Sequence, residues 1–148
     1  MKGFAILFAF AGMTLTACSQ DITQSKVPSV VLNAVQSKFG ASATIDWEKK
    51  KDRYEAELKQ DSVEYTIEVD ATGKITRQKQ DLTLQQLPPS IAQAISSQYK
   101  DFTVDDAEKV EVNGITFYQV ELDAPRGKKD LQLVFDANGN ASNTPYWD

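Results

Sequence analysis

Apolar and polar positions alternate along this chain in two patterns, and each pattern occurs twice. Behind Pro28 and again behind Pro88, apolar residues recur at the spacing of one face of an amphipathic helix. A proline suits the first helical turn because that turn does not need its N–H, so each helix should begin near its proline and end near Gly40 or Lys100. The matched positions, at an offset of 60, are Val31 and Ile91, Ala34 and Ala94, Val35 and Ile95, and Phe39 and Tyr99.

The stretches that follow each helix alternate apolar and polar residues, which is typical of strands with one buried face. Residues 54–58 match residues 118–122, and residues 65–73 match residues 131–139. The second pair ends in Asp-x-x-Gly, where the aspartate side chain can open a turn and glycine supplies a positive φ. The sequence therefore contains an internal repeat, in which a unit of one helix and three strands occurs twice.

This repeat predicts an α+β fold in which two tandem α-β-β-β repeats form an antiparallel sheet with both helices packed on one face. Sequence alone leaves open whether the strands join in one continuous sheet or form two small ones. The two halves should depend on each other, since about 60 residues make a marginal core. We assign residues 27–86 to repeat one, residues 87–141 to repeat two and residues 142–148 to a C-terminal tail.

The beginning of the chain has the makeup of a secretory signal, with Lys2 ahead of the apolar run 4–10. That run is shorter than the about 20 residues that span a bilayer as a helix. The sequence Leu-Thr-Ala-Cys at 15–18 resembles the bacterial lipobox, which implies a signal peptide at 1–17, a lipid on Cys18 and a short tether at 18–26. An ordinary secretory signal with an incidental cysteine is the alternative.

The residue that follows the cysteine is Ser19 rather than aspartate, which resembles lipoproteins sent to the outer membrane. The expected location is therefore the cell envelope, with the chain anchored by lipid to the outer membrane and facing the periplasm. Several acyl chains on one cysteine are enough for stable anchoring.

The repeated units also resemble a known family. Trp47-Glu48, the strand Tyr-x-Ala-x-Leu at 54–58 and the Asp-x-x-Gly turns are similar to those of PepSY-like proteins, also described as β-lactamase-inhibitor-like. The resemblance covers residues 27–141 and implies a small bacterial envelope protein with helices on one side of an antiparallel sheet. It also implies binding through the open sheet face rather than catalysis. Ala107 stands where repeat one has Trp47, which departs from the pattern.

In repeat two, Asn113-Gly114 predicts a two-residue type I′ hairpin turn. The resulting register puts Val120 and Ala107 toward the helices and leaves an apolar patch on the other face. Contiguous exposed apolar surface often marks an interaction site. Either the tail covers this patch, or the patch and the tail's aromatic residues bind a partner. The candidate partner-binding residues are Val110, Val112, Ile115, Phe117, Val134, Tyr146 and Trp147.

In repeat one, pairing Trp47 with Ala56 puts Lys51-Asp52 in the turn. The face opposite the helix should then be a solvated, mostly acidic surface. Its predicted members are Asp46, Glu48, Lys50, Arg53, Glu55, Glu57, Glu64 and Glu68.

Composition removes most kinds of chemistry. The 148 residues include no histidine and one cysteine, which excludes Ser-His-Asp and Cys-His nucleophiles, His-ligated zinc, thiolate clusters and internal disulfides. A net charge of −5 argues against a nucleic-acid partner, which needs a basic face. Residues 136–140 resemble only the start of a calcium loop, because Trp147 stands where that loop needs a glutamate.

We therefore expect no catalytic residue, no metal site and no cofactor. The interpretation that remains is a non-enzymatic envelope lipoprotein that binds a protein or peptide through its open sheet face, as an inhibitor or scaffold. The alternative is a periplasmic protein that senses a small ligand or cation with the acidic face of repeat one.

Overall fold

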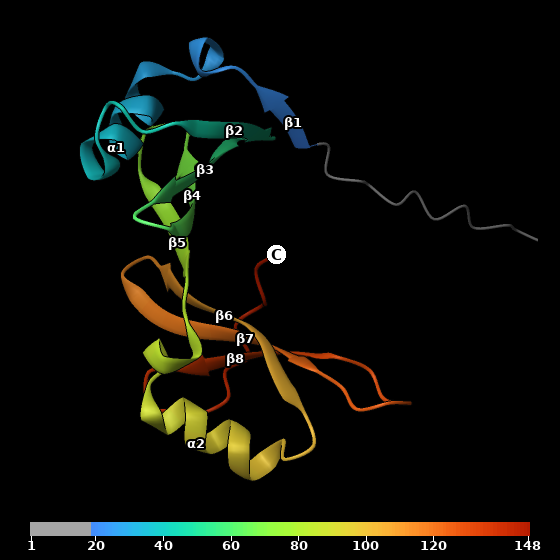
Figure 1. Cartoon of the computed structure of the whole chain (residues 1–148). Coiled ribbons are helices and arrows are strands. Elements are labelled where there is room, and N and C mark those ends of the chain that lie inside the picture. Colours follow the sequence, from blue (N-terminus) through green and yellow to red (C-terminus); the bar gives the residue numbers. More distant parts are fainter. Residues whose placement is uncertain (1–18) are drawn as a thin grey trace, which may run out of the picture.

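A computed structural model describes residues 19–148, whose strands form one antiparallel sheet of eight in chain order (Figure 1). The strands are β1 Ser19–Ile22, β2 Ile45–Lys50, β3 Arg53–Gln60, β4 Val63–Asp70, β5 Ile75–Asp81, β6 Thr103–Val112, β7 Ile115–Asp123 and β8 Leu131–Asp136. The helices are α1 Ser29–Phe39 and α2 Pro89–Gln98, each preceded by a 3₁₀ turn, η1 Gln24–Lys26 and η2 Leu84–Gln86. The predicted α+β repeat is confirmed, and the sheet is continuous because β5 pairs with β6.

Both helices pack on the same face of this sheet, as Figure 1 shows. The buried stripe of α1, Val31 and Val35, contacts a core that includes Trp47. The stripe of α2, Ile91 and Ile95, contacts a second core under repeat two. Each fully buried aliphatic side chain contributes about 1.5–3 kcal/mol, so the helices are fixed by these stripes and the opposite face of the sheet is left without a helix.

The predicted registers are confirmed in both hairpins. Trp47 pairs with Ala56, and Val110 pairs with Phe117. Asn113 adopts a φ of 49° in the tight turn before β7, as a type I′ turn requires. The phase of the four strands in these two hairpins could therefore be predicted from their apolar residues and turns.

The segment predicted as a tether is instead mostly ordered structure. Residues 19–22 form β1, which pairs antiparallel with β2 at the first edge of the sheet, and residues 24–26 form η1. Cys18 and the signal peptide lie outside the described residues. The strand escapes sequence prediction because four residues with a single apolar side chain, Ile22, cannot display a period.

Strand β5 was also missing from the predicted repeat. It is almost entirely polar, and all of its residues are half-buried rather than alternately buried and exposed. Its backbone pairs with β4 on one side and with β6 on the other. This strand is the element that joins the two repeats into one sheet.

Candidate binding face of the sheet

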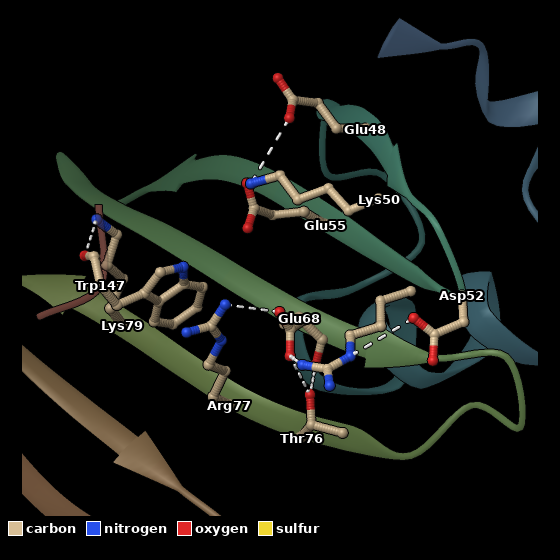
Figure 2. A network of polar contacts seen from close by, with 10 residues as sticks. Glu48, Lys50, Asp52, Glu55, Glu68, Thr76, Arg77, Lys79 and Trp147 are labelled. Atoms are coloured by element: carbon tan, nitrogen blue, oxygen red, sulfur yellow. Dashed lines mark hydrogen bonds and ion pairs between the residues drawn. The ribbon is translucent and has the colours of Figure 1, made fainter. Parts of the chain in front are cut away.

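The face of the sheet opposite α1 and α2, called the open face here, carries the candidate site. Its first half, on β2 to β5, holds a network of ion pairs (Figure 2). Its second half, on β5 to β8, carries the apolar patch and the C-terminal tail. A cleft rich in carboxylates runs across residues of β2 to β6.

Glu68 on β4 is the centre of the ion-pair network. Its carboxylate accepts hydrogen bonds from Arg53 and Arg77, both at 2.8 Å, and from the Thr76 hydroxyl at 2.7 Å. Burial by itself raises the pKa of a carboxyl, but the hydrogen bonds from Arg77, Thr76 and Arg53 outweigh it and hold the pKa of Glu68 below its ordinary value. Glu68 is therefore a charged group inside the face.

Glu55 on β3 is the second buried carboxylate of this face. Lys50 Nζ lies 2.5 Å from Glu55 Oε1 and 3.8 Å from Glu48. Glu55 and Glu68 are each only 3% exposed, so the predicted solvated surface is wrong for these two residues. The reason is that Lys50 pairs with Glu55, and Arg53 and Arg77 pair with Glu68, so these carboxylates need no water to stay charged.

The acidic cleft lies beside this network and has a volume of about 610 Å³. Burial, together with the neighbouring carboxylates Glu55 and Glu48, raises the pKa of Glu57. Burial and the carboxylates Asp106 and Glu108 raise the pKa of Asp81 in the same way. Burial is the larger cause of both shifts, and the crowded negative charge that adds to it is what a cationic group would relieve. The carboxylates that line the cleft are Asp46, Glu57, Glu64, Asp81, Asp106 and Glu108.

The C-terminal tail lies across the second half of the open face. Its Trp147 is buried, and the backbone N–H and C=O of Trp147 both bond to the side-chain amide of Gln119 on β7. Lys79 on β5 bonds to the same carbonyl and forms an ion pair of 2.9 Å with Glu108. We call these contacts, with the stack on Arg77 described below, the Trp147 site.

The structure places the predicted partner-binding residues around this tail. Val110, Val134 and Trp147 are buried, Val112, Phe117 and Tyr146 are half-buried, and Ile115 is 61% exposed at the hairpin tip. Of the two alternatives for the patch, cover by the tail is the one seen in the structure. The patch is therefore brought together as predicted, and binding of a partner by these residues stays a prediction.

Sequence reasoning missed the polar residues of the Trp147 site. Gln119 is 1% exposed, and Glu108 is also buried. Their position on the open face does follow from the predicted hairpin, in which they pair with each other. Their burial does not, because it depends on a tail that returns from far along the chain.

Tyr146 precedes Trp147 in the tail and is half-buried. Burial and the carboxylates Glu108, Glu121 and Asp106 raise the pKa of its hydroxyl far above the ordinary value.

The segment that resembles a calcium loop is a turn. Asp136 Oδ1 accepts hydrogen bonds from the backbone N–H groups of Asn138 and Asn140, and Asp70 does the same after β4 for Thr72 and Lys74. Within residues 19–148 no group of three or more carboxylates is placed to hold a metal ion. No helix in that same range is long and apolar enough to cross a membrane.

An antiparallel sheet built from two tandem repeats, with helices on one face and an open face opposite, defines the class of this protein. The family model described as "Putative beta-lactamase-inhibitor-like, PepSY-like" matches the chain twice, over residues 13–77 and 65–142. The chain belongs to this family, which confirms the resemblance seen in its repeated units. A comparison with curated proteins finds no match.

Several solved structures with the same fold come from species of Bacteroides. A BLIP-like protein from Bacteroides fragilis has 25% identity and a TM-score of 0.65, over 81% of this chain and 92% of that one. A DUF2874 family protein from Bacteroides uniformis has 19% identity and a TM-score of 0.70, over 77% and 85%. A protein from Bacteroides eggerthii, described among "putative periplasmic proteins", has 18% identity and a TM-score of 0.72, over 78% and 85%.

Proposed function

We propose that this chain is a non-enzymatic lipoprotein of the bacterial envelope that binds a protein or peptide with the open face of its sheet. The observation that supports this most directly is the layout of the sheet. Both helices cover one side of the eight-stranded sheet. The other side carries the apolar patch, which the tail covers, and separately the acidic cleft of about 610 Å³.

The comparisons support binding rather than catalysis. The family is described as inhibitor-like, and the relative from Bacteroides fragilis is described as BLIP-like. The proposed mechanism is steric: the sheet covers a surface of its partner or holds that partner in place. Carboxylates of the cleft orient a partner that carries basic side chains, since complementary charge sets orientation and association rate.

Site-specific crosslinking in the cell tests this function. A photoreactive residue at Ile115 or Glu57 samples the open face, and the same residue at Leu84 samples the helix side. Leu84 is a matched control because it is apolar and 52% exposed, against 61% for Ile115. We expect one recurrent protein from both open-face positions and none of it from Leu84. Equal capture from all three positions, or no captured protein, contradicts the proposed function.

The envelope location rests on Cys18 and the residues before it, and on the periplasmic description of a relative. A Cys18→Ser variant should lose metabolic labelling by a fatty acid and leave the membrane fraction. Wild-type chain that takes up no fatty acid would identify the segment as an ordinary secretory signal.

A further inference from the structure

The tail shows what the open face can recognise, beginning with the backbone of a bound segment. Trp147 N–H donates to Gln119 Oε1 at 3.1 Å, and Gln119 Nε2 donates to the Trp147 carbonyl at 2.7 Å. Lys79 Nζ donates to the same carbonyl at 3.3 Å. A neighbouring strand would offer the same pair of contacts, one acceptor and one donor. The contacts of Gln119 with the Trp147 N–H and C=O need an extended backbone but do not depend on the side chain of the residue that makes them.

The Gln119 amide is held in the orientation that this contact needs. Its Nε2 also donates to Glu108, which fixes which end of the amide faces the Trp147 carbonyl. Lys79 balances the charge of Glu108 across 2.9 Å. Because Gln119 and Glu108 are both buried, neither side chain can turn to solvent while the tail is seated.

The site also recognises an aromatic ring. The guanidinium of Arg77 lies 4.1 Å from the centre of the Trp147 ring, and Lys79 Nζ lies 5.6 Å from it. Figure 2 shows the indole beside Arg77, whose other side holds Glu68 at 2.8 Å. A guanidinium fixed by a carboxylate is a platform for an electron-rich ring, and tryptophan gives the strongest such contact.

The tail nevertheless fits this site incompletely. A cavity of about 140 Å³ remains beneath it. The sheet contributes Val110, Val112, Phe117 and Val134 to its walls, and the tail contributes Pro145 and Trp147. An apolar cavity of about 150 Å³ is large enough to hold benzene. In addition, Trp147 Nε1 and Arg77 Nε are buried with no hydrogen-bond partner in residues 19–148, which costs free energy. An occupant that fills the cavity, satisfies Arg77 Nε and buries no unpaired N–H of its own would bind better than the tail.

We propose that the Trp147 site binds an extended segment of the partner that carries an aromatic residue, and that the tail is an intramolecular occupant which this segment displaces. This deepens the proposed function, on which it rests, by giving the chemistry of the partner. A short tether holds the tail at an effective concentration on the order of millimolar. Only a segment that competes at that level therefore gains access to the patch.

The first test uses the full chain and a fluorescein-labelled peptide with the sequence of residues 142–148. Trp147→Ala removes the ring and so weakens the hold of the tail on the site, and Asn143→Ala is the matched control, because Asn143 is an exposed tail residue. We expect the peptide to bind Trp147→Ala at least tenfold more tightly than wild type or Asn143→Ala, as measured by fluorescence anisotropy. Adding Gln119→Leu to Trp147→Ala should remove that gain. Equal binding by folded Trp147→Ala and wild type overturns the proposal.

The second test needs no variant and covers the case in which Trp147→Ala does not fold. The chain has two tryptophans, and Trp47 is buried in the core under α1. In wild-type chain labelled with 5-fluorotryptophan, excess peptide should move the fluorine resonance of Trp147 toward that of an exposed indole and leave that of Trp47 in place. No movement of the Trp147 resonance in millimolar peptide overturns the proposal.

Two further outcomes have defined meanings. If wild-type chain forms a dimer with rising concentration and Trp147→Ala does not, the tail serves a second copy and the proposal is overturned. If crosslinking from Ile115 captures a partner but neither peptide test succeeds, the proposed function stands and this inference fails. If the peptide binds and no partner is ever captured, the proposed function fails.

Discussion

Glu68 illustrates, at the scale of one residue, how a carboxylate can be buried on a sheet face and keep its charge. Arg53, Arg77 and Thr76 donate to it, and together they hold its pKa below the ordinary value despite its burial. The folded chain therefore binds fewer protons at this site than the unfolded chain in the acid range. Its contribution to stability rises with pH there.

Replacing this charge should destabilise the protein in a way that depends on pH. Glu68→Gln should lower the free energy of unfolding at pH 7 by about 2 kcal/mol, since hydrogen bonds to charged groups contribute about 1.5–3 kcal/mol. The stabilisation is complete above the pKa of an unfolded glutamate and is lost as the pH falls through the lower pKa of folded Glu68. The free energy of unfolding, measured with urea, should therefore change less between pH 7 and pH 3 for Glu68→Gln than for wild type.

Glu64→Gln is the matched control for this experiment. Glu64 lies on the same strand and face and pairs with Lys59 at 2.9 Å, but the two side chains are 62% and 61% exposed. An exposed pair of this kind contributes about 0–1 kcal/mol. If Glu68→Gln and Glu64→Gln lower the free energy of unfolding equally, the buried network around Glu68 contributes no more to stability than an exposed ion pair.

Two turns position the helices on the sheet at the scale of elements. Gly73 follows β4 with a φ of +86°, and a Cβ there would lie 2.8 Å from the backbone oxygen of Val30 in α1. Gly139 follows β8 and would meet Ser90 of α2 at the same distance. The repeated Asp-x-x-Gly sequence thus does more than reverse the chain. It sets how closely the start of each helix approaches the sheet.

A side chain at Gly73 should push α1 away from this turn. Gly73→Ala should lower the free energy of unfolding by more than about 2 kcal/mol. The positive φ accounts for about 1–2 kcal/mol of this loss, and the clash with α1 accounts for the rest. Gly127→Ala is the control, because Gly127 has a φ of +89° with nothing within 4 Å of the added Cβ. In thermal unfolding, Gly73→Ala should lower the melting temperature more than Gly127→Ala does. Equal shifts in melting temperature would rule out the clash.

The two repeats diverge after these turns, and here prediction from sequence failed. Repeat one continues into β5, whereas repeat two makes a single bridge from Phe135 to Ala141 and then leaves the sheet as the tail. An apolar face identifies β2 or β7, but the central residues of β5 are polar and are ordered by charged partners on the strands to either side, β4 and β6. Arg77 pairs with Glu68, and Lys79 pairs with Glu108.

The same limit applies to the candidate site. The hairpin at Asn113 and the apolar patch could be predicted, because turn chemistry and strand period are local properties. The contacts of Gln119 with Trp147 could not, since they join positions 28 residues apart through a tail with no regular pattern. What the sequence left undecided was the arrangement of polar side chains on a face that only the complete fold creates.

At the scale of the whole molecule, β5 makes one sheet out of two cores. The core under α1 and the core under α2 are separate clusters, and the backbone pairing of β5 with β6 runs between them. Each repeat alone would be marginally stable because of its size. The stability of each half therefore depends on the other half.

The two halves should consequently unfold together. Trp47 reports on the first core and Trp147 on the second half of the open face. With 5-fluorotryptophan in both positions, the native resonances should disappear over the same range of urea concentration, as expected for a two-state transition. Separate midpoints would show that β5 and β6 join the repeats without coupling their stability.

The ends of this sheet have a consequence of their own. At one end β1 has only four residues, and at the other the outer side of β8 is occupied by the bridge to Ala141 and by a hydrogen bond from Ser142 to the Val134 carbonyl. Long free strand edges are templates on which further chains add and fibrils grow. This protein offers a broad face to partners while leaving little edge for its own copies, so crowded molecules are protected from polymerising strand by strand.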